Sequence, residues 1–230
     1  MEHDIIFPTI GTKIDFQSPN SKYIVKIKHP LNLSDSFKEY ADNYFYSAHL
    51  VAEELRSPQC RDISKLDTWF FPLAFLYRHS IELLLKAVVF KIIPDSEKPV
   101  DVIRKIFHKP QCCLEYIIKN SEYKRSADEI EWLNKYLFSM EKIDSESDTF
   151  RYPFHLNGNK NIGYSISFAF EKQTHVDLNE FVSNFEAAYE ILKNWYNQSD
   201  EPSCKYRTAS FSLINQGGSY YNQSVIATYG

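Results

Sequence analysis

A long apolar run, residues 70–93, carries charged side chains near its middle and is the strongest constraint on the fold. Its apolar residues recur at helical spacing: Phe70, Ala74, Tyr77, Ile81, Leu84 and Val88. On a helix Arg78, Glu82 and Lys86 are four residues apart and share one side, with His79 beside them. Burying a charge is costly unless the charge is paired. This cluster therefore indicates either an active site or a set of paired charges that fixes the packing of a helical bundle.

This central helix has clear ends in the sequence. Pro72 fits near the first turn of a helix, so the regular part is predicted to run from about 70 to 92. Pro94 and Asp95 are expected to end it. Leu83 and Leu85 widen the apolar stripe until most of the circumference is apolar, which is typical of a helix surrounded by others.

Three more helices are predicted from apolar stripes that follow capping boxes. Each begins with a serine or aspartate followed three residues later by a glutamate: Ser36 and Glu39, Ser126 and Glu129, and Asp177 and Glu180. The first is expected to end at Ser57 and Pro58. Shorter helices are expected near 100–107 and 113–120.

Strand patterns are few. Residues 164–170 alternate between apolar and small side chains, after the turn-forming Asn157-Gly158-Asn159, which predicts a hairpin within 154–176. Residues 23–27 suggest an edge strand. We therefore expect a mainly α protein, an up-and-down helical bundle of four to five main helices with a small β-hairpin appendage. The bundle spans 34–199, between an N-terminal extension, 1–33, and a polar tail, 200–230.

Composition excludes several function classes. The sequence has only 6 glycines and neither nucleotide-binding glycine motif, and its four cysteines have no Cys-x-x-Cys spacing. No cofactor and no metal site are therefore expected. The net charge of −4 gives no overall attraction to nucleic acid but leaves room for a local basic patch. Charges interrupt the long apolar run and no signal peptide is evident, so we expect a cytoplasmic protein that does not enter the membrane.

Several segments, taken in order, resemble the HEPN superfamily of prokaryotic toxins and defence proteins. Residues 48–55 resemble the end of that family's first helix, and residues 80–88, with Glu82 and Lys86, resemble its second. Phe150-Arg151-Tyr152-Pro153 resembles its Arg-Tyr-Pro, and Phe107-His108-Lys109 the start of its third helix. The resemblance implies a helical bundle, a homodimer, a cognate partner protein and, for many members, metal-independent cleavage of RNA.

The family's nuclease site is an arginine followed by four to six residues and a histidine. In this chain Arg151 and His155 have three residues between them, and so do Arg104 and His108, so the family's motif itself is absent. An arginine can clamp a phosphate and a histidine can exchange a proton near neutral pH. The expected catalytic residues are therefore Arg151, His155, Arg78 and His79.

Residues expected to bind RNA or a nucleotide beside this site are Glu82, Lys86, Tyr152 and His108. Other interpretations stay open. Arg151 could cap a helix or pair with the acidic loop 144–148, and residues 78–86 could form a purely structural ion ladder. The rival function is a non-catalytic HEPN-like module that binds a nucleotide, a nucleic acid or a partner, and Tyr220-Tyr221 suggests a docking segment.

Overall fold

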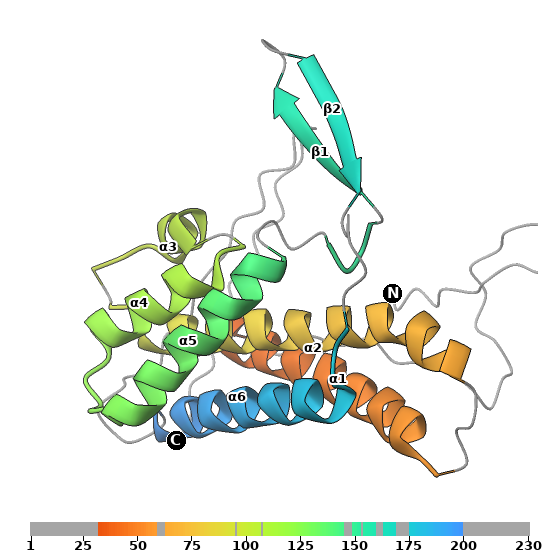
Figure 1. Ribbon diagram of the computed structural model, residues 1–230. Helices are drawn as coiled ribbons and strands as arrows, with labels where there is room; N and C mark the ends of the chain where they lie inside the picture. The colour runs from red at the N-terminus through yellow and green to blue at the C-terminus, as the bar shows by residue number, and fades with distance from the viewer. Residues whose placement is uncertain are drawn as a thin grey trace, which may run out of the picture. The chain divides into compact units, whose positions relative to one another are not determined.

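The computed structural model describes residues 32–58, 63–94, 96–106, 108–144, 149–152, 154–159, 163–168 and 175–199. All of them lie within the second of the two compact units into which the chain divides, residues 31–230. Six helices and two strands are present among these residues (Figure 1). The elements are α1 (Leu33–Arg56), α2 (Ile63–Ile92), α3 (Pro99–Ile106), α4 (Pro110–Asn120), α5 (Ala127–Ile143), β1 (Phe154–Asn159), β2 (Gly163–Phe168) and α6 (Leu178–Gln198).

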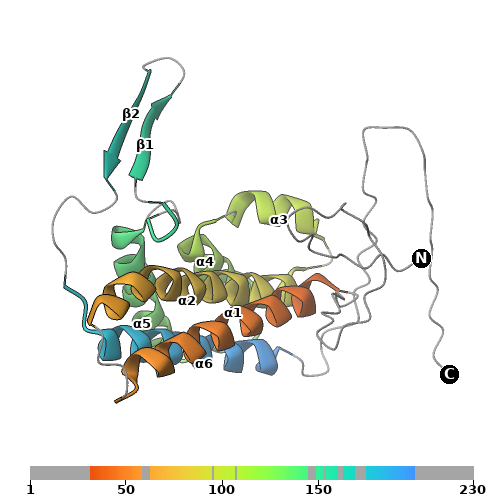
Figure 2. The same ribbon diagram turned by 90° about the vertical axis from the view of Figure 1, so that its right-hand side faces the viewer.

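The helix α2 lies at the centre of the bundle and packs against α1, α4 and α6. Helices α1, α2 and α6 run side by side in both views, and α5 packs against α4 and α6 (Figures 1 and 2). The short helix α3 contacts α4. The predicted helical bundle is therefore confirmed, with the apolar helix as its axis.

The core follows from the side chains that each helix turns toward α2. Ala41, Ala48 and Ala52 of α1 are fully buried, and their small size lets the two backbones approach closely. In α2 every residue from Ser80 to Phe90 is buried, as the widened apolar stripe predicted. Helix α6 contributes large buried rings, among them Phe185, Tyr189 and Trp195.

The start of α2 differs from the prediction. The helix begins at Ile63, so Pro72 lies inside it rather than in its first turn. A proline there removes one backbone hydrogen bond and costs about 3 kcal/mol in a helix interior. Leu73 and Ala74 are fully buried beside it, and the Phe70 ring packs on Phe181 of α6 at 5.0 Å. The burial of these apolar side chains offsets the free-energy cost of Pro72. The sequence rule had assumed that this cost keeps a proline out of the helix interior.

The first predicted cap is also wrong. Asn32 is the N-cap of α1, and its side chain accepts a hydrogen bond from the Asp35 backbone N–H at 2.8 Å. Ser36 lies inside the first turn, where its hydroxyl donates to the Asn32 carbonyl at 2.8 Å. Asparagine caps a helix as well as serine does, so the helix starts one turn earlier.

The other two capping positions are correct. The Asp177 side chain accepts from the Glu180 backbone N–H at 3.0 Å, as predicted. Ser126 occupies the N-cap of α5 but its side chain makes no capping hydrogen bond. Glu129 instead accepts a 2.8 Å hydrogen bond from the Trp195 indole N–H, which joins α5 to α6.

Both strands of the predicted hairpin are present. Strands β1 and β2 pair in antiparallel register, from Phe154 opposite Phe168 to Asn159 opposite Gly163. Asn157-Gly158-Asn159 therefore belongs to β1 instead of forming the turn, a correction to the prediction. Gly163 begins β2 with a φ of 82°, a conformation that favours glycine. The predicted strand at 23–27 and the tail from 200 lie outside the described residues.

None of the helices in the described part of the chain is long and apolar enough to cross a membrane. The long helix α2 fails this criterion although it contains the most apolar stretch of the sequence. The same polar residues that interrupt that stretch form the first candidate site.

Candidate functional site

The charged residues of α2 form a buried ladder in which each side chain has an ionic partner. Glu82 is 2% exposed, and its Oε1 lies 2.6 Å from Lys86 Nζ. Arg78 Nη1 lies 3.7 Å from Glu82 Oε2, a looser contact. Lys86 and Arg78 are themselves buried. The three residues therefore form the structural ion ladder that the sequence left open as one of two interpretations.

Arg78 makes its shortest contacts outside α2. Its Nε lies 2.7 Å from Asp144 Oδ2, an ion pair rather than an aligned hydrogen bond, and its Nη2 donates to the Asp144 carbonyl at 3.0 Å. Asp144 is the C-cap residue of α5 and is 1% exposed. Arg78 therefore ties the central helix to the end of α5. The sequence left open a pairing of Arg151 with the acidic loop 144–148; the first residue of that loop, Asp144, pairs with Arg78.

His108 belongs to the same network at its solvent edge. Its Nδ1 lies 2.8 Å from Glu82 Oε1, while its side chain remains 54% exposed. Burial tends to raise the pKa of the Glu82 carboxyl, but Lys86 and His108 together hold that pKa below its ordinary value. Glu82 is thus a carboxylate shared by two basic side chains. Glu82 therefore joins α2 to His108, which lies two residues before the start of α4.

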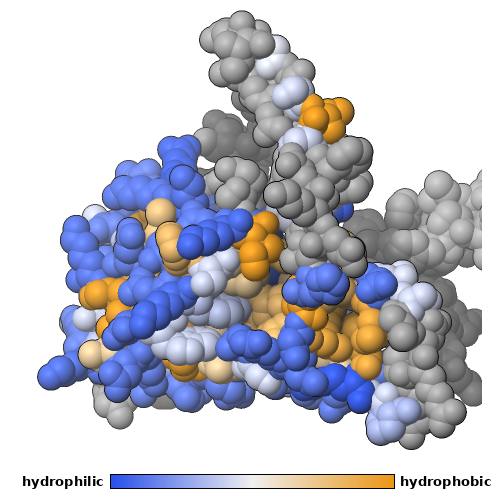
Figure 3. Space-filling view, in the orientation of Figure 1, coloured by the Kyte–Doolittle hydropathy of each residue, from blue (hydrophilic) through white to orange (hydrophobic). Residues whose placement is uncertain are grey.

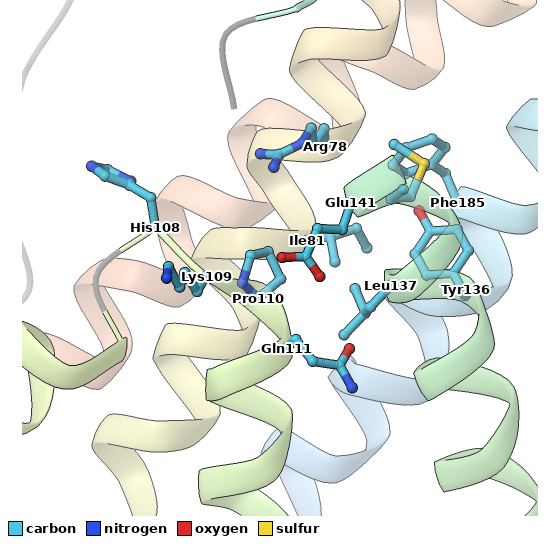
Figure 4. A pocket seen from close by; sticks show the side chains of 11 residues that line it. Arg78, Ile81, His108, Lys109, Pro110, Gln111, Tyr136, Leu137, Glu141 and Phe185 are labelled. Carbon is cyan, nitrogen blue, oxygen red and sulfur yellow. The ribbon is translucent and has the colours of Figure 1, made fainter. Parts of the chain in front are cut away.

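A small cleft borders this network (Figure 4). Arg78 and Ile81 of α2, His108 to Gln111 at the start of α4, and Tyr136 and Leu137 of α5 line it. The volume open to the centre of a water-sized sphere is about 20 Å³. That volume holds a water molecule and is far below the size of a nucleotide site. Among the described residues, the cleft beside the ladder is therefore too small for a nucleotide.

His79 is oriented away from the ladder, between two aromatic rings. Its imidazole meets the Tyr44 ring of α1 edge-on at 4.6 Å and stacks on the Phe75 ring, one turn earlier on α2, at 5.5 Å. Burial lowers the pKa of His79, and the charges of Lys86 and Arg151 add to that effect against the opposing charge of Glu82. A neutral imidazole, able to accept a proton, is therefore favoured at neutral pH.

Arg151 reaches the same aromatic ring from a different part of the chain. Its guanidinium lies 5.9 Å from the centre of Phe75 and 5.7 Å from that of Tyr152, within the range of cation–π contacts. Both Arg151 and Tyr152 are exposed. The Phe75 ring is thus contacted by both a fixed positive charge and a neutral histidine. We call Arg151, Tyr152, Phe75 and His79 the aromatic patch.

The remaining predicted site residue, His155, lies in β1 opposite Ser167. Its side chain is outside the described part of the structure, so the expected pairing of Arg151 with His155 stays a prediction. Sequence reasoning missed Phe75 and Asp144. Phe75 lies four residues before His79, a helical spacing that could have indicated it. Nothing local indicates that Asp144 meets Arg78, because 66 residues separate them.

Comparisons of this chain with protein-family models, with curated proteins and with solved structures find no match. The assignment of a function therefore depends on the chemistry of these residues and on the resemblance described above.

Proposed function

We propose that this chain is a HEPN-like protein of a prokaryotic defence or toxin system, and that it cleaves RNA as a metal-independent endoribonuclease. The observation that carries the proposal is the contact of Arg151 and His79 with one ring, that of Phe75. An exposed guanidinium and a half-buried imidazole thus contact the same ring, and burial, together with the charges of Lys86 and Arg151, lowers the pKa of His79.

The two groups have complementary roles in such a reaction. Arg151 would bind the scissile phosphate and offset the negative charge that develops on it. His79, neutral near pH 7, would accept the proton of the attacking 2′-hydroxyl. Tyr152 and Phe75 would offer ring faces to neighbouring bases. The leaving oxygen needs a proton donor as well, and His155, four residues after Arg151, is our candidate for it.

The proposal includes a homodimer and leaves room for a cognate partner protein. The first turns of α2 leave three large apolar side chains partly exposed: Leu66, Trp69 and Phe71. Figure 3 shows apolar residues gathered on part of one face, beside a largely hydrophilic surface. Exposed apolar groups of this kind are typical of surfaces that meet another protein.

A cleavage assay without metal tests the proposal. The full-length protein is incubated in EDTA with an end-labelled oligoribonucleotide and with the same sequence carrying 2′-deoxyribose at the preferred position. We expect cleavage that leaves a 2′,3′-cyclic phosphate, and no cleavage at the deoxy position. Cleavage that requires metal, or that continues at the deoxy position, would exclude the proposed chemistry.

A second candidate is a HEPN-like module that binds RNA or a nucleotide without cleaving it. It is favoured by the burial of Arg78, Glu82 and Lys86 in internal ion pairs, which removes three of the expected site residues from the surface. Retardation of RNA by the wild-type protein with no cleavage product would support this candidate over the nuclease.

A further inference from the structure

Asp144 connects the buried ladder of α2 to the segment that carries Arg151. On one side its carboxylate and carbonyl contact the Arg78 guanidinium, at 2.7 and 3.0 Å. On the other side its Oδ1 accepts a hydrogen bond from the Thr149 backbone N–H at 2.9 Å. With Asp144 only 1% exposed, water competes little for these contacts. The carboxylate therefore ties Thr149 to the central helix.

The next two residues continue this attachment along α2. Phe150 is buried, with its ring 6.3 Å from that of Phe70 in an edge-to-face arrangement. Arg151 then lies over Phe75. Three consecutive residues thus contact α2 or its polar partner, the first through a backbone N–H, the second through a buried ring, and the third through an exposed guanidinium.

We infer that Asp144 is the positioning residue for Arg151, an inference that rests on the function proposed above. Residues 149–151 form a turn and not a helix or strand, so these contacts set where the segment lies. An arginine held in place before RNA binds loses less conformational freedom on meeting a phosphate. Arg78, expected to be catalytic, would then act on RNA only through Asp144.

Two substitutions separate this role from a general contribution to stability. Asp144→Asn keeps an oxygen for the Thr149 N–H but removes the negative charge that holds Arg78. Thr149→Val is the matched control, because the Thr149 hydroxyl has no hydrogen-bond partner among the described residues and its backbone N–H is retained. If Asp144→Asn proves too unstable, Arg78→Met with Asp144→Asn removes both buried charges together.

The test is the ¹⁵N–¹H signal of the Arg151 Nε–H group in the full-length protein without RNA, assigned by its absence in Arg151→Lys. The Phe75 ring should shift this signal in the wild type and in Thr149→Val. We expect Asp144→Asn, or the double variant, to move it toward the position of a free arginine. A contribution to stability alone would lower the unfolding midpoint and leave the signal in place.

An unchanged Arg151 signal in a folded Asp144 variant would overturn the inference. Under single-turnover conditions the same variant should cleave RNA up to about 100-fold more slowly, the loss that follows a misplacement of about 1 Å. The two proposals fail separately. A wild type that does not cleave RNA overturns the nuclease, while the signal of the free protein still decides whether Asp144 positions Arg151.

Discussion

The buried ladder of α2 and its neighbouring residue His79 have different surroundings. Arg78, Glu82 and Lys86 are buried and paired, whereas His79 faces two aromatic rings beside the exposed Arg151. Adjacent residues of α2 thus differ in role because the helix turns them by about 100°. A cluster of charges in sequence is therefore not one site: the ladder is buried inside the bundle, whereas the aromatic patch is half-buried at Phe75 and His79 and exposed at Arg151 and Tyr152.

A second comparison, between two glutamate–lysine pairs, shows how strongly the effect of an ion pair depends on its burial. Glu131 and Lys135 on α5 have the same i,i+4 spacing as Glu82 and Lys86, with a similar N–O distance, 2.5 Å against 2.6 Å. Their side chains are 67% and 74% exposed, against 3% and 8% in the ladder. Water and salt screen the first pair and leave the second almost unscreened.

The largest predicted effect is the loss of Glu82. Glu82→Ala leaves Lys86 buried without its partner and takes the second carboxylate from Arg78. It should lower the free energy of unfolding by about 3–5 kcal/mol, measured by urea denaturation. Glu131→Ala is the control and should leave the midpoint unchanged within error. Equal effects of the two substitutions would remove the distinction between the buried and the exposed pair.

Replacing the whole pair should cost far less than breaking it. Glu82→Leu combined with Lys86→Met leaves no unpaired charge on these two turns, and Arg78 keeps Asp144. The free energy of unfolding should then lie within about 1 kcal/mol of the wild type, or above it. The same denaturation series measures this. A double variant as unstable as Glu82→Ala would contradict this expectation. It would show that the Glu82–Lys86 pair stabilises the fold beyond the neutralisation of each charge by the other.

A smaller effect is expected from pH through His79. Burial lowers the pKa of His79 in the folded protein, so the unfolded chain binds more protons below the ordinary value of 6.5. His79 therefore lowers the free energy of unfolding as the pH falls through that value. His79→Phe keeps a ring between Tyr44 and Phe75 but cannot titrate.

The measurement is urea denaturation of both proteins at pH 7.5 and pH 5.5. We expect His79→Phe to lose less stability than the wild type between these two values. The contact of His108 with Glu82 is present in both proteins, so it does not affect the difference. Identical losses would mean that the imidazole is not held neutral by its surroundings, contrary to the role proposed for it as a base.

Local sequence rules predicted most of the helices, because a helix is indicated by the periodicity of its apolar residues and by its capping residues. The stripe in residues 70–93 correctly indicated a central helix, and its i,i+4 charges indicated the ladder. The rules failed at Pro72, where tertiary burial of Leu73 and Ala74 outweighs the missing hydrogen bond. Propensity alone carries no information about such packing.

The site was less predictable than the fold, since its contacts join distant segments. Residue types suggested Arg151 and His79 for one site, and in the structure both contact the Phe75 ring. The same reasoning placed Arg78 beside them, although a carboxylate 66 residues away holds it in the interior. Which of several basic residues stays at the surface depends on tertiary partners that no short pattern specifies.

RNA binding by Arg151→Ala tests the division between ladder and patch most directly. Fluorescence anisotropy across a range of salt concentrations would compare it with the wild type and with Arg104→Ala, which alters an exposed arginine of α3. Loss of one phosphate contact should weaken binding and reduce the salt slope by about 0.7, while Arg104→Ala should leave both unchanged. Wild-type affinity and slope in Arg151→Ala would contradict the account.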